Sequence, residues 1–281
     1  MEFTKVHGAG NDFIIINLIK EDIPAEKLSV IAKRLCTPKL SIGADGLMAV
    51  CKPDEGVEAD YKMLFYNADG GTGEMCGNGA RCIARYGYEN GLAGETQRIQ
   101  TESGIVIGTR KSERLYKVRL NNPSRIELDY DVEHDGVRYK TSYVELGVPG
   151  LPHAIVQCEG LADADLNTLR ETGCALRFHK AFPKGANVNF YELLSKDSVL
   201  IRTFERGVED FTLACGTGSG AVGIALLLKE LMDGDELRVI NPGGDLFISI
   251  NRDGHDIKDV FLTGPTNIVA TGIVMDEDME I

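Results

Sequence analysis

The amino-acid sequence predicts an α+β protein with two pseudo-symmetric domains, in each of which a curled, mainly antiparallel sheet wraps around one central helix. Three observations lead to this prediction: the chain has 281 residues, a glycine-rich motif occurs twice about half the chain apart, and short strand patterns outnumber helical ones. Because a domain usually holds about 100 to 150 residues, the length accommodates two domains. We expect an active-site cleft between them.

The duplicated motif is Cys-Gly-x-Gly, which begins at Cys76 and again at Cys215. The same shift of 139 residues (215 − 76) places Phe65 on Phe204. In each copy a β-rich run precedes the motif, and a helix-like run that ends at glycine follows it. These runs occupy 61–68 and 80–91 in the first copy, and 198–205 and 219–234 in the second. Each cysteine is therefore expected at the N-terminus of a helix.

The rest of the chain has the pattern of short strands joined by Gly, Asn and Pro turns, with two further helices expected at 24–36 and 165–176. The expected strands are FIIIN, LMAVC, RIQT, IVIGTR, YKVRL, VRYKT, YVELG, HAIVQC, VNFYEL, ELRVI, LFISI and DVFLTG. Turn residues near 121–125 and 264–267 indicate the domain boundaries. We expect an N-terminal domain of residues 1–123 plus 266–281, which carries Cys76, and a C-terminal domain of residues 124–265, which carries Cys215.

Composition and charge narrow the class of protein. With 43% apolar and 26% charged residues, the chain is typical of a folded globular protein. A formal net charge of −13 argues against a nucleic-acid partner, which requires a basic surface. The apolar run at 13–19 is too short for a signal peptide, and AVGIALLL at 221–228 is far shorter than the ~20 residues of a membrane span. We expect a cytoplasmic protein with neither nucleic acid nor membrane as partner.

Cysteine usage indicates neither a disulfide framework nor a zinc site. The chain has an odd number of cysteines and no Cys-x-x-Cys pair. The seven are Cys36, Cys51, Cys76, Cys82, Cys158, Cys174 and Cys215. Most of them are expected to be buried packing, since free cysteine behaves as a small hydrophobe. We expect no metal.

The two motif cysteines fit a particular chemistry. The positive end of a helix favours the thiolate, and its unpaired N–H groups bind a carboxylate that glycines allow to approach closely. If both loops held one carboxylate, the neighbouring carbon would have a sulfur on either face. A proton could then leave to one sulfur and return from the other. The pattern favours two-base racemisation or epimerisation, with the helix starts stabilising the negative charge that develops.

A plainer interpretation also exists. A single Cys-Gly-x-Gly is typical of a tight turn into a helix, without any catalytic role. Two copies in matched register favour function, because a turn does not require sulfur in both. Cys82 is the internal comparison: it lies in the first helical run, its counterpart in the second copy is Ala221, and we interpret it as structural.

The sequence resembles the diaminopimelate epimerase family over essentially its full length. The motifs that carry the resemblance are KVHGAGNDF, NADGGTGEMCGNGARC, GANVNF and RTFERGVEDFTLACGTGSG. Members of this family are cofactor-independent enzymes that interconvert LL- and meso-diaminopimelate in lysine and cell-wall biosynthesis. The resemblance implies an isomerase without pyridoxal phosphate or any other cofactor, whose partner is a small-molecule amino-acid substrate.

The resemblance also implies roles for individual residues. Cys76 and Cys215 match the two catalytic bases. The positions that match the grip on the reacting carboxylate are Gly77, Asn78, Gly216 and Thr217. The positions around the reacting amino group are Asn11, His153 and Glu205. The positions that hold the far carboxylate and amine are Asn67, Asn187 and Arg206, and arginine suits this task because its fork pairs with a carboxylate bidentately.

Without the resemblance, several of these residues have simpler interpretations. Asn11 within GAGND is typical of a turn, and His153 before an apolar strand is typical of a buried histidine. Glu205 and Arg206 could form an ordinary surface ion pair. However, Arg206 lies nine residues before the second motif cysteine (215 − 206), as Asn67 does before the first (76 − 67). The matched spacing favours function.

Two positions depart from the family pattern. Where the family often has Gly-Asn-Pro-His, this chain has Val148 in place of the Asn and three inserted residues, Gly150, Leu151 and Pro152, before the histidine. Gly46 stands where some members have Gln. The first departure concerns the substrate, because a pocket that loses a hydrogen-bond donor binds a charged group about 1–3 kcal/mol more weakly.

Three hypotheses follow from the sequence. The first is a diaminopimelate epimerase, and the second is a racemase of another amino acid, such as histidine or lanthionine, that uses the same two thiols. The third is a binding protein controlled by a disulfide between the two motif cysteines. The sequence leaves open which thiol is ionised at rest, and whether the protein is a monomer or a homodimer.

Overall fold

The computed structural model describes residues 1–73 and 77–279, and the chain divides into two compact units. Unit 1 comprises Met1–Val118 and Gly264–Ile281, and unit 2 comprises Arg119–Thr263. The expected boundaries at 123/124 and 265/266 fall at the first residue of strand β8 (Pro123–His134) and the last residue of strand β16 (Asp256–Pro265). The second segment of unit 1 therefore comes from the C-terminal end of the chain.

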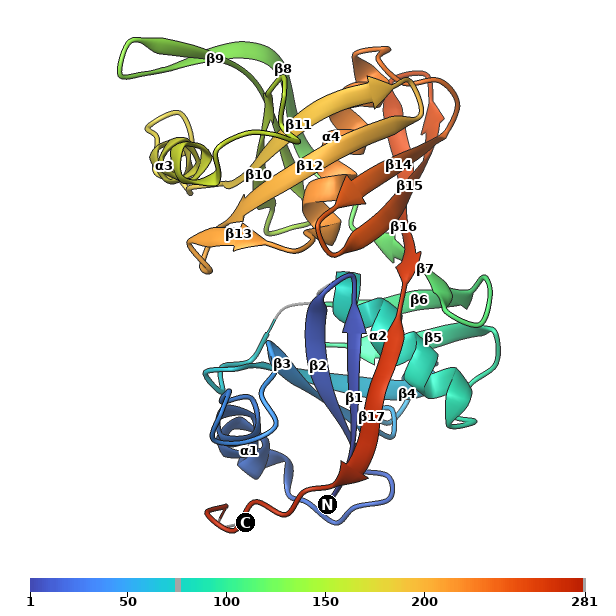
Figure 1. The fold of residues 1–281 in the computed structure, drawn as a ribbon. Helices are drawn as coiled ribbons and strands as arrows, with labels where there is room; N and C mark the ends of the chain where they lie inside the picture. The colour runs from blue at the N-terminus through green and yellow to red at the C-terminus, as the bar shows by residue number, and fades with distance from the viewer. Residues whose placement is uncertain (74–76, 280–281) are drawn as a thin grey trace. The chain divides into compact units, whose positions relative to one another are not determined.

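Unit 1 is a mainly antiparallel sheet wrapped around a helix (Figure 1). In the order in which they pair, its strands are β17 (Asn267–Ile273), β1 (Glu2–Gly8), β2 (Asn11–Asn17), β3 (Gly46–Cys51), β4 (Tyr61–Asn67), β5 (Thr96–Thr101), β6 (Gly104–Arg110) and β7 (Leu115–Leu120). The pairs β2–β3 and β4–β5 are parallel, and the other neighbouring pairs are antiparallel. Helix α2 (Gly77–Glu89) packs against β1, β2 and β6.

Unit 2 is built in the same way. Its strands, in pairing order, are β8, β9 (Val137–Leu146), β10 (Leu151–Gln157), β11 (Asn187–Ser195), β12 (Ser198–Glu205), β14 (Glu236–Asn241), β15 (Gly244–Asp253) and β16. The pairs β10–β11 and β12–β14 are parallel, and the other neighbouring pairs are antiparallel. A short strand, β13 (Asp210–Thr212), forms a hairpin with β12. Helix α4 (Gly216–Leu228) packs against β9, β10 and β15.

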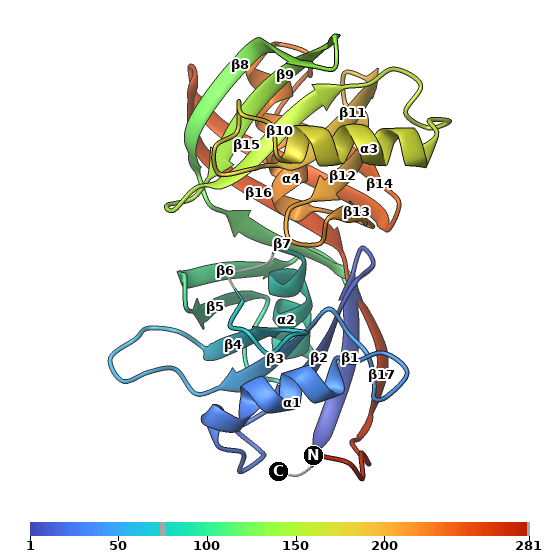
Figure 2. The same cartoon turned by 90° about the vertical axis from the view of Figure 1, so that its left-hand side faces the viewer.

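The two units therefore repeat one topology element by element. Each has the same succession of antiparallel and parallel pairs, and each has a second helix on the opposite side of the sheet from the central one (Figure 2). Helix α1 (Leu28–Leu35) packs against β3 and β4, and helix α3 (Leu166–Arg177) packs against the equivalent strands β11 and β12. The two units differ in the source of the edge strand: β8 directly precedes β9 along the chain, whereas β17 reaches β1 from the C-terminal segment. The expected fold with two pseudo-symmetric domains is confirmed.

Local sequence explains the helices. Helix α1 buries Leu28, Ile31, Ala32 and Leu35, which recur with helical spacing on one face. Helix α3 begins where the side chain of Asp165 accepts a hydrogen bond from the Thr168 N–H at 2.9 Å, as an N-cap does. The central helices are buried on nearly all sides. Their many glycines and alanines let the curled sheet approach the helix backbone.

Strands at the edges were less predictable. The sequence patterns gave no strand at 123–134 or 267–273, yet these residues form the equivalent edge strands β8 and β17. Both strands are largely exposed or half-buried, so they lack the apolar alternation that marks a core strand. None of the described helices is both long and apolar enough to cross a membrane.

A buried polar link ties the central helix of unit 1 to its sheet. The Tyr61 hydroxyl lies 2.6 Å from Gln97 Oε1 and 3.1 Å from the carbonyl oxygen of Ile83. Gln97 Nε2 in turn donates to the carbonyl oxygen of Ala84 at 2.7 Å. Tyr61 and Gln97 are fully buried. The link holds two consecutive carbonyls of α2 against β4 and β5.

We predict that Tyr61→Phe lowers the free energy of unfolding by about 1–3 kcal/mol, because Gln97 Oε1 would be left buried without its donor. Urea denaturation measures this loss. Tyr88→Phe is the matched control, since Tyr88 lies on the same helix with its ring 4.5 Å from the Arg110 guanidinium, a contact that phenylalanine preserves. Equal stabilities of the Tyr61→Phe variant and the unmodified protein would show that the link contributes nothing.

Candidate functional site

Cys215 occupies the N-cap position of α4, with extended backbone angles (φ −112°, ψ 110°). Its Sγ accepts a hydrogen bond from the Gly218 N–H at 3.3 Å and lies 3.6 Å from Thr217 Oγ1. The side chain is buried. These contacts confirm the expected position of this cysteine at a helix start, where the helix dipole and a backbone N–H both favour a thiolate. Gly216 and Thr217 form the first turn of the same helix.

The last glycine of the motif is required by packing. A Cβ atom at Gly218 would lie inside contact distance of Asn189 Oδ1 and 3.1 Å from Cys215 Sγ. Any side chain at this position would therefore displace either the sulfur or the buried amide. The hydrogen bond to the sulfur uses the backbone of this same residue, so the glycine both donates to the thiol and leaves room for it.

His153 is fully buried on β10, directly beside Asn187 of the parallel strand β11. Its Nδ1 lies 3.3 Å from Asn189 Nδ2, which assigns the acceptor role to Nδ1 and the proton to Nε2 in the neutral ring. Among the described residues, Nε2 has no hydrogen-bond partner. Burial, with a smaller contribution from the charge of Arg206, lowers the pKa of His153 to about 3. The imidazole is therefore neutral at physiological pH.

Asn189 is a residue of this region that the sequence analysis missed. It is fully buried and donates through Nδ2 to the carbonyl oxygens of Ala154 at 3.1 Å and Asn187 at 3.3 Å. Its Oδ1 accepts a hydrogen bond from Thr203 Oγ1 at 2.9 Å. The amide thus connects β10, β11 and β12 beneath the start of α4. An asparagine alternating with apolar residues in the core strand VNFYEL was the signal for it.

The polar residues of β11 and β12 meet where β12 ends. Asn187 Oδ1 accepts a hydrogen bond from the Arg206 backbone N–H at 2.8 Å, and its Nδ2 donates to the Pro152 carbonyl oxygen at 3.3 Å. Glu205 Oε2 accepts from Thr212 Oγ1 of β13 at 2.8 Å. In unit 2, Asn189 therefore links His153 with Asn187, and Asn187 in turn binds the backbone of Arg206.

The corresponding half-site of unit 1 surrounds the start of α2. Asn11 Nδ2 donates to Asp45 Oδ2 at 2.5 Å, and Asn11 Oδ1 lies 3.5 Å from Asn78 Nδ2. The buried Arg81 guanidinium donates to Asn78 Oδ1 at 3.0 Å and lies 3.4 Å from the Gly77 carbonyl oxygen. Asn11, Gly77 and Asn78 are thus brought together. Cys76, the expected first base, lies outside the described residues.

Two further positions of unit 1, Asn67 and Gly46, were singled out from the sequence. Asn67 is the last residue of β4 and lies opposite Gly46 of β3. A Cβ atom at Gly46 would lie 2.5 Å from the Phe65 ring and 2.8 Å from the Tyr66 carbonyl oxygen, so no side chain could enter here without a shift of these neighbours. In residues 1–73 and 77–279, no group of three or more His, Cys, Asp or Glu side chains is arranged to hold a metal ion.

Comparison with solved structures identifies the fold. A phenazine biosynthesis protein of the PhzF family from Bacillus anthracis superimposes with a TM-score of 0.73 at 16% identity, covering 97% of this chain and 98% of that one. A hydroxyproline epimerase from Agrobacterium vitis superimposes with a TM-score of 0.67 at 16% identity, covering 99% and 93%. This chain therefore has the two-domain fold that these proteins share.

Sequence comparison identifies the family. A family model described as diaminopimelate epimerase matches residues 3–126 and 148–269. The chain is 38% identical to a diaminopimelate epimerase of Aquifex aeolicus (strain VF5) over the whole of both chains, and 36% identical to one of Bacillus cereus over 96% of both. The chain belongs to the diaminopimelate epimerase family, and it is an isomerase of the epimerase and racemase class.

The buried imidazole predicts a pH effect on stability. The folded-state pKa of His153, about 3, is below the unfolded value of about 6.5, so the unfolded chain binds the extra proton in this window and stability falls as pH falls. One such group contributes a slope of about 1.4 kcal/mol per pH unit. Urea unfolding between pH 6.5 and 4 should therefore show a steeper loss for the unmodified protein than for His153→Gln. Parallel profiles would contradict the buried neutral ring.

Gly218→Ala should lower the free energy of unfolding by about 1–3 kcal/mol, since the added methyl overpacks the space between Asn189 and Cys215. Gly94→Ala is the control, because a Cβ at Gly94 meets nothing within 4 Å and should change stability by less than about 0.5 kcal/mol. Urea denaturation of both variants measures the difference. Equal effects of the two substitutions would show that Gly218 is not constrained by its neighbours.

Proposed function

We propose that this protein interconverts LL- and meso-diaminopimelate without a cofactor, by a two-base mechanism in which Cys76 and Cys215 act as thiolate and thiol in turn. One observation carries the proposal. Cys215 caps the central helix of unit 2, and α2, the topologically equivalent helix of unit 1, begins at Gly77, the second residue of the matching motif. The full-length relatives named diaminopimelate epimerase supply the substrate class.

The chemistry follows from the two helix starts. A thiolate removes the α-proton of the bound amino acid, and negative charge develops on the adjacent carboxylate. Backbone N–H groups at Gly77, Asn78, Gly216 and Thr217 stabilise that charge. The other thiol then donates its proton to the opposite face of the carbon, which inverts the configuration and leaves the two sulfurs with exchanged protonation states. The mechanism requires one sulfur on each face of the reacting carbon.

The remaining residues would bind the rest of the substrate. Asn11, His153 and Glu205 lie around the reacting amino group in this proposal. The neutral ring of His153 would donate a hydrogen bond through Nε2–H to an acceptor atom of the substrate. Asn67, Asn187 and Arg206 hold the far end, where Arg206 pairs with the far carboxylate. Val148 is 92% exposed in the turn between β9 and β10, so its departure from the family pattern lies on the surface of unit 2.

The same proposal places the protein in the cytoplasm, where thiols stay reduced. Oxidation of a thiolate that faces a thiol is facile, so activity should require a reductant.

We predict that LL-diaminopimelate incubated with the reduced protein in D₂O yields meso-diaminopimelate that carries deuterium at the inverted α-carbon, whereas L-histidine takes up no deuterium. Cys76→Ala and Cys215→Ala should each reduce turnover by at least about 10³-fold, because general acid–base catalysis contributes 10²–10⁴-fold and each variant lacks one of the two groups. Mass spectrometry follows the label and chiral chromatography follows the epimers.

Cys174→Ala is the matched control, since Cys174 is an exposed cysteine of α3 and its removal should leave turnover unchanged. Label entering histidine and not diaminopimelate would favour the racemase of another amino acid. An absence of exchange with any amino acid would favour the disulfide-controlled binding protein. Full activity in either motif variant would remove the two-base mechanism.

A further inference from the structure

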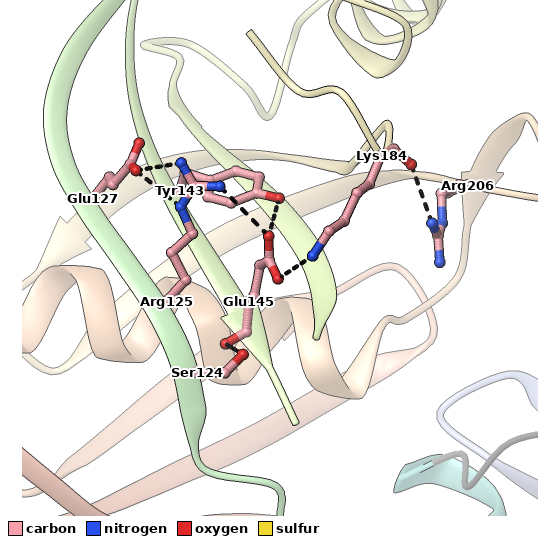
Figure 3. A network of polar contacts seen from close by, with 7 residues as sticks. All are labelled: Ser124, Arg125, Glu127, Tyr143, Glu145, Lys184 and Arg206. Carbon is pink, nitrogen blue, oxygen red and sulfur yellow. Dashed lines mark hydrogen bonds and ion pairs between the residues drawn. The ribbon is translucent and has the colours of Figure 1, made fainter. Parts of the chain in front are cut away.

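The guanidinium of Arg206 is bonded to the backbone of a neighbouring loop. Its Nη1 donates to the carbonyl oxygen of Lys184 at 3.2 Å (Figure 3). Lys184 lies in the connection between α3 and β11, and a hydrogen bond of this kind uses one of the five N–H donors of the guanidinium. The direction in which Arg206 presents its other donors therefore depends on where this loop places the Lys184 carbonyl.

Strand β9 holds that loop at two points. The Phe182 ring stacks on the Tyr143 ring, with centroids 5.5 Å apart and planes inclined by 10°. Two residues further along both segments, Lys184 Nζ donates to Glu145 Oε2 at 2.8 Å. Tyr143 and Glu145 are alternate residues of one strand and so lie on one face of it. The loop is thus fixed to one face of β9 by an aromatic contact and, two residues further along, by an ion pair.

Glu145 is a buried, ionised carboxylate. Its side chain is 5% exposed, although that of Lys184 is 58% exposed. The Tyr143 hydroxyl donates to Glu145 Oε1 at 2.8 Å, and Arg125 Nη1 lies 3.9 Å from the same oxygen. Burial opposes ionisation of this carboxyl group, but the hydrogen bonds from Lys184 and Tyr143 outweigh it and lower its pKa. The carboxylate is therefore charged at neutral pH, and Lys184 is closer to it than Arg125 is.

The inserted residues make room for this carboxylate. A Cβ atom at Gly150 would lie inside contact distance of Glu145 Oε2 and 2.9 Å from Ser124 Oγ. Gly150 is the first of the three residues that the chain has in addition to the family's Gly-Asn-Pro-His pattern. A side chain at this position would displace Glu145. The insertion and the buried carboxylate therefore belong to one local arrangement at the end of β9.

We propose that Glu145 and Lys184 are positioning residues for Arg206: the buried carboxylate fixes Lys184, and the Lys184 carbonyl fixes the guanidinium that receives the far carboxylate of the substrate. This inference rests on the proposed function, in which Arg206 binds that carboxylate. Because an ion pair with a largely exposed partner adds little to stability, the arrangement is better explained by geometry than by folding. Glu145 and Lys184 act through Arg206 and touch neither reacting atom.

The test is steady-state kinetics of Lys184→Met and Glu145→Gln with LL-diaminopimelate under reducing conditions. Both variants should raise KM about 5- to 20-fold and change kcat less than about two-fold, because they disturb binding of the remote carboxylate and not the proton transfer. The double variant should be no worse than the worse single one, since both act through one link. Lys184→Arg preserves the cation, so its KM should be close to that of the unmodified protein.

Lys196→Met is the matched control: Lys196 is an exposed lysine of unit 2 that pairs with the exposed Asp233 at 3.1 Å, and its KM should equal that of the unmodified protein. Urea denaturation accompanies each variant, and Lys184→Met should unfold at the same midpoint as the control. If the unmodified protein turns over LL-diaminopimelate and Lys184→Met has an unchanged KM, whether or not its kcat falls, the positioning role is wrong. If the unmodified protein does not turn over this substrate, the proposed function fails first and the inference fails with it.

Discussion

The hydrogen bond from the Gly218 N–H to the sulfur of Cys215 is the interaction on which the candidate site depends. A surface helix could shift its first turn at little cost, but α4 is buried by the strands around it, so its N-terminus stays where the sheet places it. The sulfur is therefore held at a fixed point with a backbone donor directed at it. The buried amide of Asn189 closes the space behind this turn, which is why the motif needs a glycine there.

The duplicated topology relates the fixed start of α4 to the start of α2. Each unit surrounds a central helix with the same succession of strand pairs, and each central helix begins at the second residue of a Cys-Gly-x-Gly motif. A fold that uses one arrangement twice can supply two chemically alike groups, which the proposed two-base mechanism uses. The surrounding residues are not duplicated: unit 1 has the buried Arg81 in its helix where unit 2 has Gly220. The two halves can thus hold similar sulfurs in different electrostatic surroundings.

Much of this was predictable from sequence because it depends on local pattern. The glycine-flanked cysteine, the amphipathic helix with Leu28 and Leu35, and the apolar core strands each have a signature within a few residues. The edge strands β8 and β17 do not, since exposure on both faces removes the apolar alternation. The buried polar connections were also missed. Glu145 and Lys184 lie 39 residues apart, and nothing local to either predicts that a carboxylate and a lysine will meet at the end of β9.

In the proposed reaction, two different groups act on the two faces of one carbon. The most direct measurement is the location of the label in the first few per cent of a reaction of LL-diaminopimelate in D₂O. With two bases, the proton that leaves the substrate is not the one that returns, so the meso product should carry solvent deuterium while the recovered LL substrate remains unlabelled. Meso product that retains the original α-hydrogen would show that a single base carries the proton from one face to the other, and would contradict the account.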